Sequence, residues 1–133
     1  MKILIVEQSS RTREKLNDLL DNEGYEVYLA QNVTDALRTL KMVKDISVVL
    51  SDLTMPEMDA MTFMKIAKKT CKNKDLSILI QFCENEWIKE LKESGKDIGV
   101  TAWIPKPLKK DALLGAVEKV IGRLTNNYAR KTA

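Results

Sequence analysis

Hydrophobic and polar positions along this 133-residue chain follow two patterns that take turns from one end to the other. Short apolar runs rich in β-branched residues are typical of parallel strands that are covered on both faces. Between these runs, apolar residues recur every three or four positions, which is typical of helices with one buried face. The strands predicted from this pattern are residues 3–6, 25–30, 46–50, 76–80 and 100–104.

Capping and helix-ending residues mark the ends of the helices expected between the strands. Ser9 or Ser10 can cap the first helix, and Gly24 is well placed to end it. Asn32 and Asp59 can cap the second and third helices with their side-chain oxygens. A charged fourth helix is expected from about residue 85 onwards, and an amphipathic last helix is expected over residues 109–126.

Strands that alternate with helices predict an α/β fold in three layers, α/β/α. The five predicted strands form a doubly wound parallel sheet, and the five helices cover both of its faces through right-handed crossovers. We expect residues 1–126 to form one domain and residues 127–133 to form a frayed C-terminal tail.

Composition and charge exclude several classes of function. The net charge is only +3, and the lysines are scattered rather than gathered into a basic stripe with aromatics, so we expect no nucleic-acid binding. No apolar run approaches the roughly 20 residues of a membrane span, and we expect a cytoplasmic protein without membrane insertion. The chain has no histidine, which excludes His-ligated metals and Ser-His or Cys-His pairs within it.

Candidate site residues follow four of the predicted strands. Because ligands of open parallel sheets bind at the carboxyl ends of the strands, these side chains are expected to converge on one rim. Two carboxylates and a lysine suit a divalent cation and a phosphate, and Asp52 is a credible nucleophile that forms an acyl phosphate. The residues at these strand ends are Glu7, Gln8, Asp52, Phe82, Cys83 and Lys106.

Three motifs at these strand ends resemble those of receiver domains of two-component response regulators, including the single-domain chemotaxis regulators. They are Ile-Val-Glu ending at Glu7, the run Asp52-Leu-Thr-Met-Pro-Glu-Met-Asp, and Lys106-Pro107. The resemblance covers nearly the whole chain and implies the flavodoxin-like strand order 2-1-3-4-5.

The resemblance also implies roles for individual residues. Asp52 would accept a phosphoryl group from a histidine kinase, a phosphotransfer protein or a small phosphodonor. Lys106 would contact the phosphoryl group, often across a cis bond to Pro107. Glu7 and the backbone carbonyl of Thr54 would hold Mg²⁺ together with Asp52.

The chain departs from the family pattern at the metal site and at the switch. Gln8 replaces a second acid that ligates the metal directly; its amide oxygen can still ligate the metal but is neutral, so we expect weaker Mg²⁺ binding. Phe82 stands at the usual Thr or Ser position and Cys83 at the usual alanine, although a shift of one residue would bring Gln81 or Cys83 there instead. Trp103 stands at the aromatic switch position, usually Tyr or Phe.

Three classes of function follow from these residues. The first is a stand-alone receiver, a signalling switch rather than an enzyme, that contacts a downstream protein near Trp103 on the face of the fourth helix, fifth strand and fifth helix. The alternative is a pseudo-receiver that binds proteins without phosphorylation, which Gln8 and Phe82 favour. An enzyme or flavin carrier on the same fold ranks lowest, because the connection after the first strand has no glycine to hold a phosphate.

Overall fold

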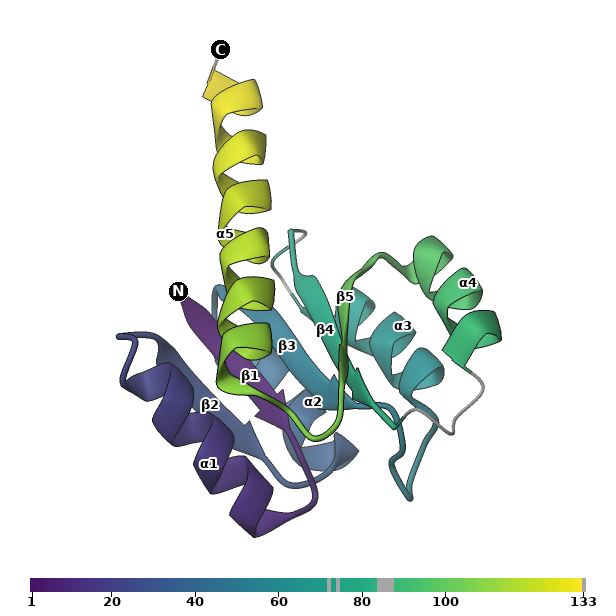
Figure 1. Cartoon of the computed structure of the whole chain (residues 1–133). Helices are drawn as coiled ribbons and strands as arrows, with labels where there is room; N and C mark the ends of the chain where they lie inside the picture. The colour runs from purple at the N-terminus through teal and green to yellow at the C-terminus, as the bar shows by residue number, and fades with distance from the viewer. Residues whose placement is uncertain (72, 74, 84–87, 133) are drawn as a thin grey trace.

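The computed structural model describes residues 1–71, 73, 75–83 and 88–132 of the chain. Strands and helices alternate along it (Figure 1). The strands are β1 (Lys2–Val6), β2 (Glu26–Ala30), β3 (Ile46–Asp52), β4 (Ser77–Phe82) and β5 (Val100–Pro105). The helices are α1 (Ser10–Asp21), α2 (Val33–Met42), α3 (Ala60–Thr70), α4 (Ile88–Ile98) and α5 (Lys110–Thr132).

The strands form one parallel sheet in the order β2-β1-β3-β4-β5. Helices α1 and α5 cover one face of the sheet, and α2, α3 and α4 cover the other (Figure 1). Parallel strands require crossover connections, and α1, α2, α3 and α4 each connect one strand to the next. The predicted doubly wound, three-layer fold is therefore confirmed.

Successive strand residues pack into two separate cores, one on each face of the sheet. In β3, Val48 and Leu50 pack with residues of α1 and α5, whereas Val49 packs with residues of α2 and α3. All three side chains are completely buried. Because both faces are covered, the strands read as continuous apolar runs instead of alternating ones.

The predicted capping residues begin three of the helices. Ser9, Asn32 and Asp59 each accept a hydrogen bond from the backbone N–H three residues later, at 3.3, 2.8 and 3.0 Å. These bonds satisfy N–H groups that have no partner inside the helix. Gly24 lies in the turn after α1 with a φ of 86°, a conformation that glycine adopts at little cost.

The last helix is longer than the sequence pattern suggested. It continues to Thr132, so the backbone of residues 127–132, expected to be a frayed tail, is helical. This segment contains neither glycine nor proline to end the helix. The predicted start of the fourth helix near residue 85 lies outside the described residues, and α4 is described from Ile88.

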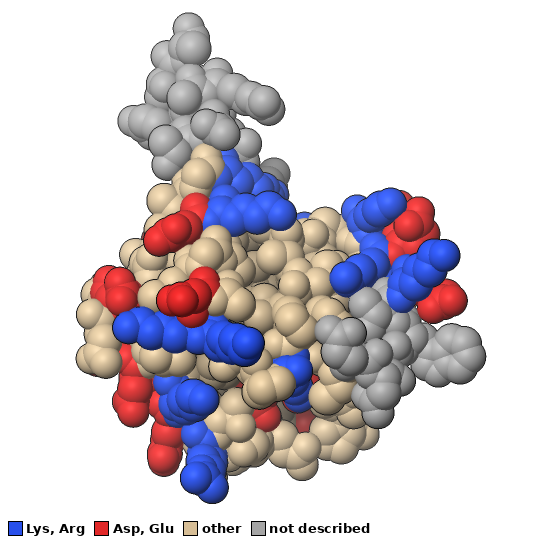
Figure 2. All heavy atoms as spheres, viewed as in Figure 1, with Lys and Arg blue, Asp and Glu red and all other residues tan. Residues whose placement is uncertain are grey.

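Acidic and basic side chains are interspersed over the face of the molecule seen in Figure 2. Two of the ion pairs join neighbours on one helix, Arg38 with Asp35 at 3.4 Å and Lys96 with Glu93 at 3.0 Å. Within the described part of the chain, no helix combines the length and the apolar character that crossing a membrane would require.

Candidate phosphoryl-acceptor site

The carboxyl ends of β1, β3 and β4 bring the side chains of Glu7, Asp52 and Gln81 together at one edge of the sheet, which we call the acidic corner. Strand alternation directs Glu7, Asp52 and Gln81 to the face covered by α1 and α5, because each stands two positions after a strand residue in that core. Asp52 lies opposite Gln81 in the register of β3 and β4. The topology thus places these side chains side by side although they are far apart in sequence.

Asp52 and Lys106 form an ion pair at this corner. The Lys106 Nζ atom donates to Oδ2 of Asp52 at 2.5 Å, and the side chains are 30% and 12% exposed, respectively. The N–H of Thr54 donates to the other carboxylate oxygen at 3.2 Å. The Lys106 N–H donates to the Phe82 carbonyl at 2.7 Å, which fixes the lysine to the end of β4. The peptide bond from Lys106 to Pro107 is cis, as the family resemblance implied.

The surroundings of Lys106 favour its charged form. Partial burial lowers the pKa of the ammonium, but its hydrogen bond to Asp52 and the charges of Asp52 and Glu7 outweigh this effect. The net result is a pKa raised above the ordinary value of 10.5. Lys106 therefore carries its positive charge throughout the neutral range.

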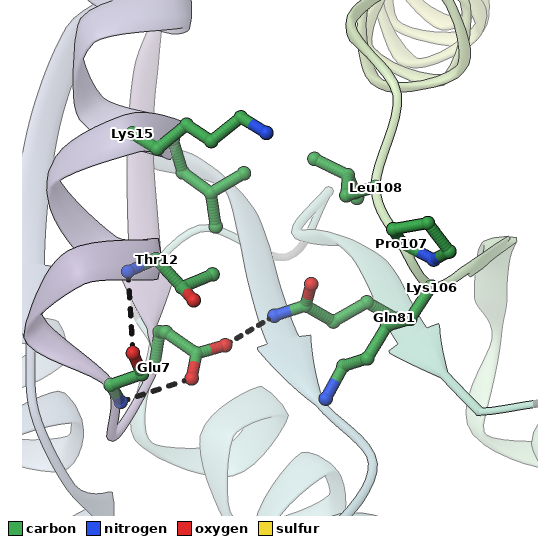
Figure 3. Close-up of a pocket in the computed structure, with 9 residues that line it drawn as sticks. Glu7, Thr12, Lys15, Gln81, Lys106, Pro107 and Leu108 are labelled. Carbon is green, nitrogen blue, oxygen red and sulfur yellow. Dashed lines mark hydrogen bonds between the residues drawn. The ribbon is translucent and has the colours of Figure 1, made fainter.

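Glu7 is a buried acid held by two donors. Its side chain follows β1, and the residue is only 5% exposed. The Ser9 N–H donates to Oε1 at 3.1 Å, and the Gln81 amide Nε2 donates to Oε2 at 2.6 Å (Figure 3). Arg13 donates to the Glu7 backbone carbonyl at 2.8 Å, which ties the first turn of α1 to this position.

A pocket of about 330 Å³ opens beside Glu7, between α1 and the connection from β5 to α5 (Figure 3). Gln81 and Lys106 contribute to its lining, together with Thr12 and Lys15 of α1 and Leu108. The pocket therefore lies next to the acidic corner, and its lining combines charged, polar and apolar side chains.

Gln8 lies away from this pocket. It is exposed and borders a separate shallow hollow with Gln31, Asn32, Pro56 and Glu57. The role of Gln8 as a metal ligand therefore stays a prediction.

The carboxylate oxygens of Glu7 and Asp52 suit a magnesium ion as ligands. Among the described residues, no three or more His, Cys, Asp or Glu side chains are grouped for a metal, but Mg²⁺ often takes only one or two carboxylates and completes its shell with water. Each oxygen of Glu7 and Asp52 accepts one of the contacts described above. Since a carboxylate oxygen has two lone pairs, all four retain capacity to bind a cation.

Phe82 and Trp103 lie on the opposite face of the sheet from Glu7. Phe82 is 5% exposed and belongs to the core under α2, α3 and α4, against which Trp103 packs. The two rings meet edge to face, with centroids 6.3 Å apart and planes at 69°. The Lys92 Nζ atom lies 5.2 Å from the centre of the Phe82 ring. Cys83 is half-buried after the end of β4.

Gly95→Ala is expected to displace Trp103, because a Cβ atom at Gly95 would lie 2.7 Å from Cζ2 of Trp103 and 3.2 Å from Cγ2 of Val100. A red shift of the Trp103 emission, measured in a Trp87→Phe background, would report the displacement.

Gly115→Ala in α5 is the matched control, since nothing lies within 4 Å of its Cβ position. It should stabilise the helix by about 1 kcal/mol and leave the emission unchanged. Unchanged emission in Gly95→Ala would show that the Trp103 packing is not as described.

Comparison with known proteins identifies the family. Residues 3–118 match the response regulator receiver domain, and the chain therefore belongs to this family, the signalling switches of two-component systems. Sporulation initiation phosphotransferase F of Bacillus subtilis is 30% identical over 125 residues, which cover 94% of this chain and 97% of that protein. Chemotaxis protein CheY1 of Helicobacter pylori is 31% identical over 126 residues, which cover 92% and 98%.

A solved structure agrees with this assignment. The chemotaxis response regulator CheY4 of Vibrio cholerae superposes with a TM-score of 0.79 and 31% identity, covering 90% of this chain and 97% of that chain. Other relatives are longer: the chain spans about half, 52%, of the response regulator MprA of Mycolicibacterium vanbaalenii.

Gln81 is the residue whose place sequence reasoning left most open. A polar residue after the apolar run of β4 signals a strand end, but nothing local to it indicates Glu7 as its partner. The sequence placed Phe82 at the hydroxyl position, with Gln81 or Cys83 reached by a shift of one residue. The structure brings the Gln81 side chain to the acidic corner and packs Phe82 into the core.

Proposed function

We propose that this chain accepts a phosphoryl group on Asp52 from a histidine kinase or a phosphotransfer protein in the cytoplasm. The ion pair of Asp52 with Lys106 at the carboxyl ends of the strands carries this proposal. A carboxylate oxygen of Asp52 forms a bond to phosphorus while the bond to the donor breaks, and the donor atom leaves with the electron pair. The product is an acyl phosphate on Asp52.

Other residues at the corner support this transfer. The Lys106 ammonium can move from the carboxylate to an oxygen of the incoming phosphoryl group, because its charge persists at neutral pH. Glu7, Asp52 and the Thr54 carbonyl would hold Mg²⁺, with Gln8 as an additional neutral ligand. The ion would neutralise charge on the phosphoryl oxygens.

The output of this switch is a contact with a downstream protein. We place this contact on the surface of α4, β5 and α5, where Trp103 is partly exposed and packs against Phe82. Phe82 and Cys83 take the place of the usual hydroxyl and small residue, so the coupling from Asp52 to Trp103 runs through a different set of side chains than in the family pattern.

Intact-mass analysis after incubation with acetyl phosphate and Mg²⁺ tests the proposal. A single phosphoryl adduct on the protein is expected. A folded sample that gains no adduct under these conditions would overturn it and favour the pseudo-receiver, which binds its partner in the unmodified form.

Gln8→Asp is expected to tighten Mg²⁺ binding by about tenfold, because it restores a negative charge near the cation. Calorimetric titration with MgCl₂ measures the affinity. Asn22→Asp, which adds the same charge at the far end of α1, is the control and should change the affinity little. Equal affinities of Gln8→Asp and the parent protein would remove Gln8 from the metal site.

A further inference from the structure

Gln81 is a buried polar side chain to which the proposed phosphoryl transfer gives no role. It is 1% exposed and follows three completely buried apolar residues of β4. A buried amide costs free energy unless it is hydrogen-bonded. Its Nε2 atom donates to Glu7 at 2.6 Å, and its oxygen points away from Glu7 toward the pocket between Lys15 and Leu108 (Figure 3).

The Glu7 carboxylate is held by one backbone donor and one side-chain donor. Its two oxygens have different donors, the Ser9 N–H on Oε1 and the Gln81 amide on Oε2. The Lys106 ammonium makes its hydrogen bond to Asp52 instead. Among the side chains that the structure describes, Gln81 is thus the one that donates to Glu7.

The backbone of Gln81 is fixed to the strand that carries Asp52. Gln81 pairs with Asp52 in the sheet register, and its carbonyl accepts a 2.9 Å hydrogen bond from the Leu53 N–H. One residue therefore joins the Glu7 carboxylate to the backbone directly after Asp52. Two carboxylates that share a cation must keep a fixed separation, and this connection can maintain it.

We propose that Gln81 is a positioning residue that fixes the Glu7 carboxylate for Mg²⁺; the inference rests on the metal role assigned to Glu7 in the proposed function. Without the amide donor, Glu7 can rotate, and one of its buried oxygens loses its partner. Because this hydrogen bond is made to a charged group, its loss is expected to weaken the affinity for Mg²⁺ by roughly three- to tenfold.

A double-mutant cycle separates positioning from mere packing. Gln81→Met keeps the length of the side chain but removes the donor, and Glu7→Gln removes the carboxylate. Mg²⁺ affinity is measured by NMR titration of the backbone amides with MgCl₂, which also reports the fold of each variant. Gln81→Met is expected to weaken binding in the parent protein and to have no further effect in Glu7→Gln.

Two additional variants keep the test interpretable. Gln81→Leu replaces the methionine variant if that variant does not fold, and the same loss of affinity is expected. Leu79→Val lies on the same strand and face, removes packing without touching Glu7, and should bind Mg²⁺ like the parent protein.

The possible failures are distinguishable. If Glu7→Gln loses affinity but Gln81→Met does not, the positioning role is overturned and the metal role of Glu7 stands. An equal loss from Gln81→Met with and without Glu7 would also overturn it. If Glu7→Gln binds Mg²⁺ normally, the metal role of Glu7 in the proposed function fails, and the inference about Gln81 fails with it.

Discussion

Asp52→Asn is expected to abolish the phosphoryl adduct that acetyl phosphate forms on the parent protein. An amide is a poor nucleophile and cannot form the acyl phosphate, while its similar shape preserves the end of β3. Intact-mass analysis with Mg²⁺ measures the adduct. The expected effect is complete loss, the largest effect predicted for any single change in this chain.

Asp59→Asn is the matched control for this experiment. It removes a neighbouring carboxylate in the same connection, and asparagine caps a helix as well as aspartate does. The control should form the adduct like the parent protein. An adduct on Asp52→Asn would show that another residue accepts the phosphoryl group and would contradict the assignment of Asp52.

Lys106→Met is expected to slow adduct formation by about a hundredfold, the loss typical when one charged stabiliser of a transition state is removed. Methionine keeps most of the aliphatic length but cannot contact a phosphoryl oxygen. Because the pKa of Lys106 is raised above 10.5, its charge should persist well above neutral pH. The rate difference should therefore remain constant between about pH 6 and pH 9.

Lys15→Met controls for the loss of a lysine from the same pocket, since Lys15 lines it from α1. Its rate should stay within about twofold of the parent rate. Time courses of intact mass, with circular dichroism to verify folding, give both rates. A Lys106→Met protein that reacts as fast as Lys15→Met would refute the phosphoryl contact.

The sequence predicted the fold because each local pattern agreed with the overall topology. The continuous apolar runs of β1, β3 and β4 required a sheet covered on both faces, and the structure has helices on both. Asn32 and Asp59 begin helices where their types suggested. The continuation of α5 through residues 127–132 was not predicted, although neither glycine nor proline stands there to end the helix.

The candidate site was only partly predictable for a different reason. Asp52 ends β3 and Lys106 directly follows β5, and both strands pair with β4, so the positions of the strand ends were enough to predict that the two residues share one rim. The bond from Gln81 to Glu7 joins residues 74 positions apart. It depends on which of two successive β4 residues faces α1 and α5, and a shift of one residue exchanges the faces of Gln81 and Phe82.

The opposite orientations of Gln81 and Phe82 also suggest how a change at the acidic corner could reach the aromatic pair of Phe82 and Trp103. Gln81 and Phe82 are consecutive, yet one bonds to Glu7 and the other packs against Trp103 across the thickness of the sheet. The peptide plane between them is held by the Leu53 N–H, which donates to the Gln81 carbonyl. A tilt of this peptide plane would move both side chains at once, so β4 joins the candidate phosphoryl-acceptor site directly to the surface proposed for the downstream partner.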